Sequence, residues 1–315
     1  MPELRTAKKQ NQRQVYGETL VELGKQNQDI VVCEADLSKS TMTCLFQEAF
    51  PERFFEMGIA EQNMTSFAAG LSLAGKIAFS NSFAVFAAGR AYDQIRQGIA
   101  IGKLNVKIVG SSTGLSDFGD GATHQAVEDI AIMSAIPNMT VLAPVDGVET
   151  RKMIRAIVDF RGPVYVRLNR NDLPDLFPEG EDFAIGQPCV LREGTDAVVF
   201  ANGVMVSKAL QAAVVLESEG LSVRVVNVST LKPVDEEQLK ALSEGTRAIV
   251  TAEEHSLIGG LASVVTYALR GLGVPIETVG IRDCFGQSAH DYEELLECYG
   301  LTEKHITAAL RKMMI

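Results

Sequence analysis

Short runs of apolar residues alternate along the chain with segments in which apolar positions recur at helical spacing. In the first half, such runs predict buried strands at residues 30–33, 106–109, 140–142 and 164–168, with helices between them at 15–25, 61–74, 87–100 and 148–160. Strands that alternate with helices build a parallel sheet with helices on both faces. The first half therefore predicts a three-layer α/β/α domain.

This alternation pauses and then starts again. Residues 171–187 contain two prolines and several acids with little periodicity, which is typical of a connection between domains. Beyond them, strands are expected at 197–200, 223–226, 248–251 and 276–279, and helices at 204–218, 235–243, 257–269 and 291–299. We therefore predict two α/β domains with mainly parallel sheets, at 8–175 and 189–315, joined by a linker at 176–188.

Composition narrows the class of protein. The chain has 315 residues, 46% of them hydrophobic, and 29 Lys and Arg against 40 Asp and Glu give a net charge of −11. That excess of acids argues against binding to nucleic acid or to an anionic membrane. The five cysteines form no CxxC pair, no apolar run is long enough to cross a bilayer, and the N-terminus lacks the apolar core of a signal peptide. We therefore expect a cytoplasmic protein with reduced thiols.

Candidate chemistry lies just after the predicted strands, where open parallel sheets bind their ligands. The segment MGIAEQNM (57–64) places Glu61 at the start of an apolar helix, and SNSFAVF (80–86) places Phe83 and Phe86 three residues apart. Each feature also has a structural explanation, because a helix start favours a carboxylate and spaced aromatic residues commonly pack in a core.

A third segment is richer in polar groups. The loop GSSTGLSDFGDGATHQ (110–125), called the glycine loop below, ends with Asp120 and His124. A histidine in such a loop can polarise a carbonyl group or move a proton near neutral pH. Arg13, Ser40 and Arg170 follow strands or lie near the chain start, and together they could bind an anion.

Two kinds of site are not predicted. No GxxxxGK[ST] motif occurs and no GxGxxG follows a strand, which disfavours ATP and dinucleotides. No His or Cys residues have the spacing of metal ligands, so no metal site is expected within this chain.

Three segments in order, GIAEQNM, SFAVF and GDGATHQAVEDIAIMSAIPNM (119–139), resemble the C-terminal half of transketolase, a thiamine diphosphate enzyme. EEHSLIGGL (253–261) and DCFGQSA (283–289) look like the C-terminal domain of the same family. The resemblance runs from about residue 12 to the end. It implies a pyrimidine-binding domain at 8–175, a transketolase C-terminal domain at 189–315, and transfer of a two-carbon ketol unit from a ketose, commonly a phosphate, to an aldose.

The resemblance gives the candidates roles toward the cofactor. Glu61 would hydrogen-bond N1′ of the aminopyrimidine and so help the cofactor's own amino nitrogen to remove the thiazolium C2 proton. Phe83 and Phe86 would stack around the pyrimidine, and Asp36 would lie near the thiazolium ring. The family often has a Tyr where this chain has Gly89.

It also gives roles toward the substrate. His124 and Asp120 would contact the hydroxyl groups and the carbonyl group of the sugar, with His124 counted as catalytic beside Glu61. Arg13, Ser40 and Arg170 match the residues that bind the sugar phosphate. The resemblance fails at one point, because Gly110 stands where transketolases commonly have a phosphate-contacting His, and the glycine loop is about two residues longer. An unusual ketose with another anionic end is therefore an alternative donor.

Half of a transketolase is missing from the sequence. The family binds the diphosphate and Mg²⁺ through GDG followed, 25 to 30 residues later, by Asn-Asn. Here the single GDG (119–121) lies in the glycine loop and no Asn-Asn pair occurs. The prediction is one subunit of a split transketolase, with an N-terminal partner subunit that binds most of the diphosphate and metal, thiamine diphosphate at the interface, and a two-fold heterotetramer.

Other interpretations remain open. A split 1-deoxyxylulose-5-phosphate synthase shares GIAEQ and RAYDQ (90–94), and pyruvate as donor separates the two because the synthase releases CO₂. The beta subunit of a 2-oxoacid dehydrogenase has the same architecture but lacks the His124 loop pattern. A non-catalytic protein on this scaffold is a third possibility, which the retained Glu61 and His124 disfavour.

Overall fold

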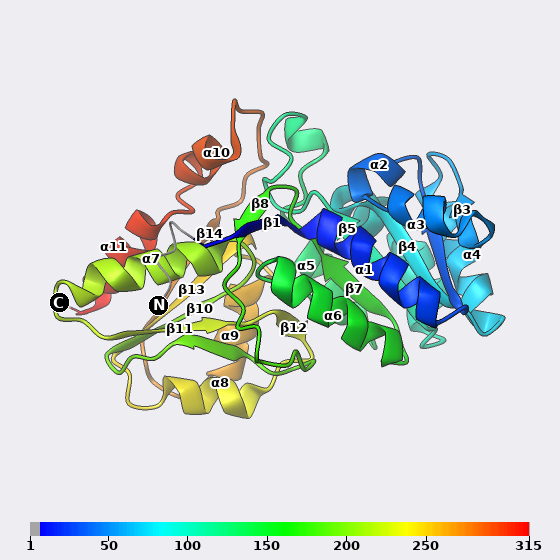
Figure 1. Ribbon diagram of the computed structural model, residues 1–315. Coiled ribbons are helices and arrows are strands. Elements are labelled where there is room, and N and C mark those ends of the chain that lie inside the picture. Colours follow the sequence, from blue (N-terminus) through cyan, green and yellow to red (C-terminus); the bar gives the residue numbers. More distant parts are fainter. Residues whose placement is uncertain (1–6, 315) are drawn as a thin grey trace.

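The apolar runs of the first half form one seven-stranded sheet in the computed structural model, which describes residues 7–314. Six neighbouring strands run parallel and the seventh, at one edge, is antiparallel (Figure 1). In order across the sheet they are β12 (Thr230–Lys232), β6 (Thr140–Leu142), β7 (Val164–Arg167), β5 (Val106–Ser111), β4 (Ile77–Phe83), β2 (Ile30–Glu34) and β3 (Phe54–Glu56).

Helices cover both faces of this sheet. On one face, α1 (Gln12–Gln26), α3 (Cys44–Ala49) and α6 (Gly147–Asp159) enclose an apolar cluster around Leu20, Phe79 and Ile157. On the other face lie α4 (Glu61–Leu73) and α5 (Asp129–Ser134). The short helical turns are α2 (Ser38–Thr41), η1 (Pro51–Arg53) and η4 (Gly121–Thr123).

One predicted helix has a different geometry. Residues 87–100 were expected as a single α-helix, but most of them belong to two π-helical segments, η2 (Val85–Arg90) and η3 (Gln94–Ala100), which residues 91–93 connect. The apolar positions Ala87, Ala91 and Ile95 are buried as expected. Apolar spacing defines the buried face, whereas it does not separate i→i+4 from i→i+5 hydrogen bonds. π-Helical turns are rare and are frequent at functional sites.

The second half forms a smaller domain of the same class. Its five-stranded sheet is parallel except for one edge strand, and runs in the order β14 (Ile276–Ile281), β13 (Ala248–Ser256), β10 (Ala197–Ala201), β11 (Val223–Asn227) and β9 (Cys189–Arg192). The helices are α7 (Met205–Glu217), α8 (Glu236–Ser243), α9 (Leu261–Ala268), α10 (Tyr292–Cys298) and α11 (Glu303–Met314). The helix expected at 257–269 begins only at Leu261, because a turn with Gly259 at φ 78° precedes it. The prediction of two mainly parallel α/β/α domains is confirmed.

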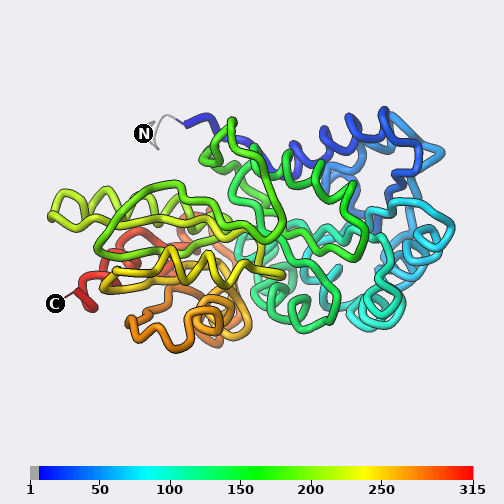
Figure 2. Tube along the Cα trace, turned by 90° about the horizontal axis from the view of Figure 1, so that it is seen from below, coloured from blue at the N-terminus to red at the C-terminus, as the bar shows by residue number. Residues whose placement is uncertain are grey.

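The two domains lie side by side and are interleaved (Figure 2). β1 (Lys9–Asn11) pairs antiparallel with β8 (Asp172–Pro174), and β12 from the second half completes the first sheet. Residues 176–188 contain no helix or strand, yet they are attached to the domains. The Phe177 amide donates a 2.6 Å hydrogen bond to the Asp146 carboxylate, and the Gly186 amide donates one of 3.1 Å to Thr230 Oγ1.

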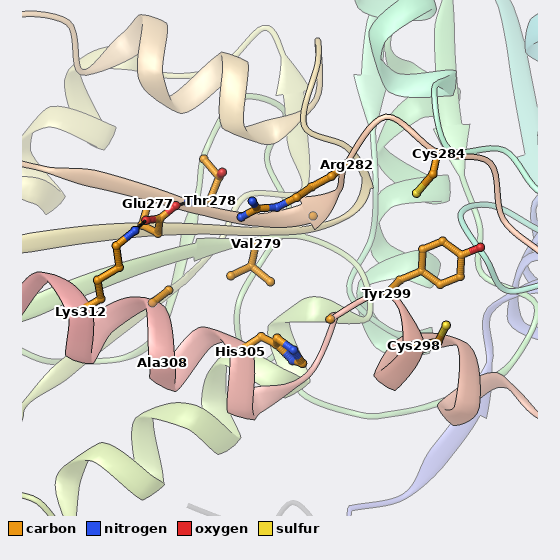
Figure 3. Close-up of a pocket in the computed structure, with 13 residues that line it drawn as sticks. Glu277, Thr278, Val279, Arg282, Cys284, Cys298, Tyr299, His305, Ala308 and Lys312 are labelled. Atoms are coloured by element: carbon orange, nitrogen blue, oxygen red, sulfur yellow. Dashed lines mark hydrogen bonds and ion pairs between the residues drawn. The ribbon is translucent and has the colours of Figure 1, made fainter.

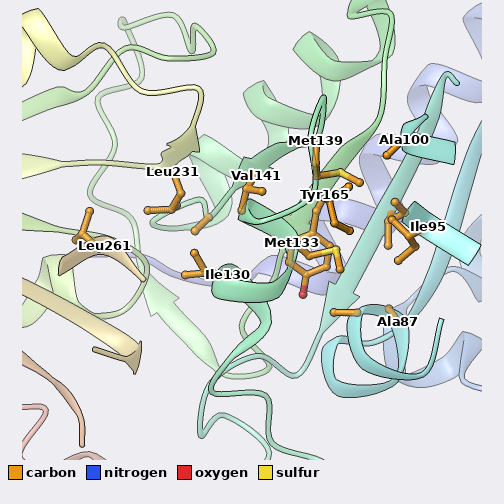
Figure 4. Packing of buried hydrophobic residues seen from close by; sticks show 14 of the residues in the cluster. Ala87, Ile95, Ala100, Ile130, Met133, Met139, Val141, Tyr165, Leu231 and Leu261 are labelled. Carbon is orange, nitrogen blue, oxygen red and sulfur yellow. The ribbon is translucent and has the colours of Figure 1, made fainter. Parts of the chain in front are cut away.

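An apolar cluster crosses the domain boundary. Ile130, Met133 and Val141 from the first domain belong to the same buried cluster as Leu231 and Leu261 from the second (Figure 4). Continuous packing of this kind couples the two domains mechanically.

No helix within residues 7–314 combines the length and apolar character needed to span a membrane. Residues 1–6, which belong to the N-terminal segment considered for a signal peptide, lie outside the described part of the chain.

Candidate active site

Glu61 lies at the edge of the first sheet where its parallel strands end. Gly58, at φ 65°, turns the chain after β3, and Glu61 is the first residue of α4. The partial positive charge of a helix start favours a carboxylate there. The side chain is only 1% exposed, so the structure places an ionisable group in a buried position at the sheet edge.

Arg90 is the partner of Glu61. Its Nη1 lies 2.9 Å and 3.0 Å from the two carboxylate oxygens, and its guanidinium lies 4.7 Å from the Phe86 ring centre. The Arg90 side chain is 46% exposed, unlike that of Glu61. Arg90 can therefore turn toward solvent and release an oxygen of Glu61 to a ligand. Arg90 was expected only as part of the RAYDQ segment, with no role at the site, although a lone arginine within the Ala-rich segment AVFAAGRAYD (84–93) was a usable signal.

Three aromatic rings form a wall beside this pair. The rings of Phe83 and Phe86 are 6.3 Å apart and nearly parallel, at 16°. The His124 ring lies edge-on to both, at 6.1 Å from Phe83 and 5.4 Å from Phe86. His124 Nδ1 is 2.9 Å from Thr123 Oγ1. The end of β4, the segment η2 and the glycine loop thus meet at one place, as the strand-end positions predicted.

Arg13, Ser40 and Arg170 lie together at a second place. Arg13 donates hydrogen bonds to the carbonyl oxygens of Ser40 (2.7 Å) and Arg170 (2.9 Å). Burial, together with the nearby Arg170, lowers the pKa of Arg13 to about 10. The Arg170 guanidinium lies 5.8 Å from the Phe83 ring centre, which joins this basic group to the aromatic wall. Guanidinium groups suit the binding of phosphate or a similar anion.

Two predicted acids take a less central place. Asp36 has an exposed side chain, a left-handed backbone at φ 62°, and an amide that donates a 2.8 Å hydrogen bond to Glu56. Asp120 is exposed just before η4. The acid of the glycine loop that meets Arg170 is instead Asp117, whose Oδ2 lies 2.5 Å from Arg170 Nη1.

Glu34 supports the segment that carries Asp36 and Ser40. It ends β2, is fully buried, and accepts hydrogen bonds from the hydroxyl groups of Thr41 (2.7 Å) and Thr43 (2.6 Å). Burial raises the pKa of Glu34 to about 7, despite these hydrogen bonds. Glu34 was not predicted as a site residue, because an acid that follows directly on an apolar run gives no sign of its partners in the sequence.

There is no space for a side chain at Gly110. A Cβ there would lie 2.6 Å from the Tyr165 hydroxyl oxygen and 2.9 Å from Ala84 Cα. The Tyr165 hydroxyl donates a 2.8 Å hydrogen bond to Asp129. Gly110, which stands in place of the family's His, therefore opens no space for a longer substrate, because Tyr165 and Ala84 occupy the space beside it.

A groove of about 690 Å³ lies elsewhere, between β14 and α11 in the second domain (Figure 3). In this groove, Lys312 Nζ donates a 2.8 Å hydrogen bond to the Glu277 carboxylate, so this lysine already has an anionic partner. The hydrogen bond from Lys312 lowers the pKa of Glu277. No strand-end residue of the first sheet lines this groove, which is therefore separate from the Glu61 site.

Comparison with known proteins identifies the family. Residues 8–175 match the family model of the transketolase pyrimidine-binding domain, and residues 186–306 match that of the transketolase C-terminal domain. The chain therefore belongs to the transketolase family.

Within this family, it is similar to chains that contain only these two domains. It is 46% identical over 306 residues to a transketolase C-terminal section of Methanocaldococcus jannaschii, covering 96% of each chain. It is 41% identical to a subunit of 6-deoxy-6-sulfo-D-fructose transketolase from Clostridium sp., covering 96% of this chain and 94% of that one. A solved structure described as a split gene transketolase, an inactive β4 tetramer, is 48% identical, covers 96% of this chain and 97% of that chain, and has a TM-score of 0.87. The chain is thus the C-terminal subunit type of a split transketolase.

Transketolases use thiamine diphosphate with a divalent metal, and the site fits one end of this cofactor. A buried carboxylate suits a ring nitrogen, and the paired Phe rings suit a flat heterocycle. Residues 7–314 contain no group of three His, Cys, Asp or Glu side chains placed to bind a metal ion.

Proposed function

We propose that this chain is one subunit of a two-chain transketolase, which transfers a two-carbon ketol unit from a ketose phosphate to an aldose. The proposal rests above all on one observation: the buried Glu61 carboxylate pairs with Arg90, whose guanidinium lies over the Phe86 ring in the wall of Phe83, Phe86 and His124. A partner subunit supplies the diphosphate and Mg²⁺ site, and the cofactor lies between the two chains in a two-fold heterotetramer.

The residues of this chain then have distinct tasks. The chemistry that the bound cofactor supplies is nucleophilic cleavage of the ketose next to its carbonyl group. Glu61 hydrogen-bonds N1′ of the pyrimidine and shares a proton with it, after Arg90 has turned away. Phe83 and Phe86 bind the pyrimidine ring and exclude water from it. Asp36 lies toward the thiazolium side of the cofactor.

The substrate lies between the glycine loop and the two arginines. His124 donates a hydrogen bond to the sugar's carbonyl or hydroxyl oxygen, which is a catalytic role, and Asp120 binds a hydroxyl group from the same loop. Arg13 and Arg170, with Ser40, bind the anionic end of the sugar. Asp117 holds Arg170 in place for this contact.

A ketose that carries a sulfonate is a second candidate donor. The relative from Clostridium sp. that is 41% identical is a subunit of a transketolase for 6-deoxy-6-sulfo-D-fructose. Gly110 has no side chain that could contact a phosphate as the family's His does. The two guanidinium groups only donate hydrogen bonds, and the oxygens of a phosphate or of a sulfonate can accept them. The same basic group thus suits a sulfonate as well as a phosphate.

The test is to purify this chain alone and together with a chain that carries the diphosphate-binding domain. Ketol transfer is measured with thiamine diphosphate, Mg²⁺, D-ribose 5-phosphate as acceptor, and either D-fructose 6-phosphate or 6-deoxy-6-sulfo-D-fructose as donor. We expect activity only with both chains, and the donor with the higher kcat/KM identifies the anion. Full activity of this chain alone would contradict the proposal, as would CO₂ release from pyruvate without any ketol transfer.

A further inference from the structure

The second domain contacts the glycine loop directly. The base of the loop is closed by two hydrogen bonds between Gly114 and Ala126, of 2.8 Å and 3.1 Å. The Leu115 amide, one residue further, donates a 2.8 Å hydrogen bond to Oε1 of Glu254 at the end of β13. A buried carboxylate of the second domain therefore holds the backbone of the loop at Leu115.

The approach between the two is close enough to require glycine. A Cβ at Gly114 would lie 2.3 Å from Glu254 Cδ and 2.5 Å from its Oε2, and the Gly114 backbone has φ 59°. Both facts exclude a side chain at position 114. Gly114 of the loop and Glu254 of the second domain are thus packed in direct contact.

Glu254 is fixed on its other side. Its exposed fraction is 2%, and its carboxylate accepts hydrogen bonds from the Asn169 side-chain amide (3.4 Å, at Oε2) and from the Tyr292 hydroxyl. The Glu254 backbone carbonyl accepts a 2.8 Å hydrogen bond from Arg167, which also binds Asp129. The Glu254 carboxylate therefore has little freedom to move, and the position of the Leu115 amide depends on it.

Two more contacts from the segment after β14 reach the same loop. The Ala289 amide donates a 2.9 Å hydrogen bond to the Phe118 carbonyl oxygen, and the Gln125 side chain donates one of 3.0 Å to the Gln287 carbonyl oxygen. The second domain therefore contacts the loop at three points, Leu115, Phe118 and Gln125. Between these points lies Asp117, and His124 directly precedes Gln125.

We propose that Glu254 is a positioning residue, through which the second domain sets the place of Asp117 and His124 for the sugar substrate. This inference rests on the proposed function of the first domain. The hydrogen bonds of the Glu254 carboxylate go to the loop and to its own supporting residues, not to Glu61 or the aromatic wall. Glu254 therefore acts on sugar binding through the position of the loop. The second domain is thereby part of the substrate site although it carries none of the proposed catalytic groups.

The test compares three variants in the two-chain enzyme. Glu254→Ala removes the acceptor of the Leu115 amide, whereas Glu254→Gln keeps one oxygen that can accept it. Glu253→Ala is the matched control, because Glu253 is an equally buried acid on the same strand whose carboxylate instead accepts the amides of Leu261 and Ala262. For each variant, KM and kcat are measured with D-fructose 6-phosphate, and thiamine diphosphate affinity is measured separately.

We expect Glu254→Ala to raise KM for the ketose about ten-fold and to lower kcat as well, because both Asp117 and His124 are displaced, with cofactor affinity unchanged. Glu254→Gln should restore most of the loss, and Glu253→Ala should leave KM unchanged. An equal rise of KM in Glu254→Ala and Glu253→Ala would overturn the proposal, because it would indicate a general loss of structure.

Hydrogen exchange at the Leu115 amide gives a readout that does not depend on activity. It should become about ten-fold faster in Glu254→Ala and stay unchanged in Glu253→Ala. Should Glu254→Ala fail to fold, Glu254→Asp shortens the side chain by one methylene group, withdraws the carboxylate from the Leu115 amide and should also speed exchange there. Unchanged exchange in the folded variant would refute the role of Glu254, even if ketol transfer itself is confirmed.

Discussion

The two sheets end in acidic side chains that are used in different ways. At the end of β13, Glu253 accepts hydrogen bonds from the amides of Leu261 (2.6 Å) and Ala262 (2.8 Å), and so completes the start of α9. His255 accepts the Ile130 amide at Nε2 (3.1 Å), and burial lowers its pKa to about 4, so it is neutral at pH 7. At the edge of the first sheet, Glu61 has a half-exposed arginine as its partner.

This difference separates structural acids from acids available for chemistry. An acid whose oxygens bind buried backbone amides cannot leave them without the loss of those hydrogen bonds. An acid that pairs with a mobile side chain can exchange that partner for a ligand. Under the proposed function, two domains of the same class have different tasks: the first presents the reactive groups, and the second holds the loop that faces them.

The largest effect is expected at Glu61. Glu61→Ala should lower ketol transfer by the two-chain enzyme about 1,000-fold, because the variant lacks the carboxylate that is proposed to hydrogen-bond the pyrimidine N1′. Its free energy of unfolding should change by less than about 1 kcal/mol, since Arg90 can turn to solvent. Steady-state rates and denaturant unfolding measure the two quantities. A variant that keeps a tenth of the parent activity would contradict the role of Glu61.

Glu253 should show the opposite pattern. Glu253→Ala leaves two buried amides of α9 without an acceptor and should lower the free energy of unfolding by about 3 kcal/mol. Its kcat, measured per folded molecule, should match that of the parent. A loss of kcat with normal stability would place Glu253 among the catalytic groups and remove the distinction between the two sheets.

Glu34 provides a test through pH. Because the pKa of Glu34 is raised to about 7 in the folded chain, the native state keeps a proton that the unfolded chain loses near pH 4.5. Its contribution to stability therefore falls as pH rises from about 4.5 to about 7, and is constant above. Relative to Glu34→Gln, the parent should lose roughly 3 kcal/mol of unfolding free energy across that window. Parallel stability curves would show that Glu34 titrates normally.

The helices and strands could be predicted from the sequence wherever their buried positions are occupied by apolar residues at regular spacing. β4 was not predicted as a strand, because Ser80, Asn81 and Ser82 are polar although they are buried in it. β12 was missed because three residues carry too little pattern to show that they pair with a strand of the other domain.

The site was accessible in part, and the limit has a physical cause. Short sequence segments located Glu61, Phe83, Phe86 and His124, and the topology brings them together because each lies near the end of a parallel strand. The pairings of Arg90 with Glu61 and of Glu254 with Leu115 depend on contacts between residues far apart in sequence, which spacing does not encode. Residue type therefore predicted the groups, and only the structure gave their partners.

The most direct test of the account is a structure of this chain with its diphosphate-binding partner and thiamine diphosphate. It should show the pyrimidine N1′ within hydrogen-bond distance of Glu61, the ring against Phe83 and Phe86, and the diphosphate and metal bound by the partner. A pyrimidine ring bound away from Glu61, or a diphosphate bound within this chain, would contradict it.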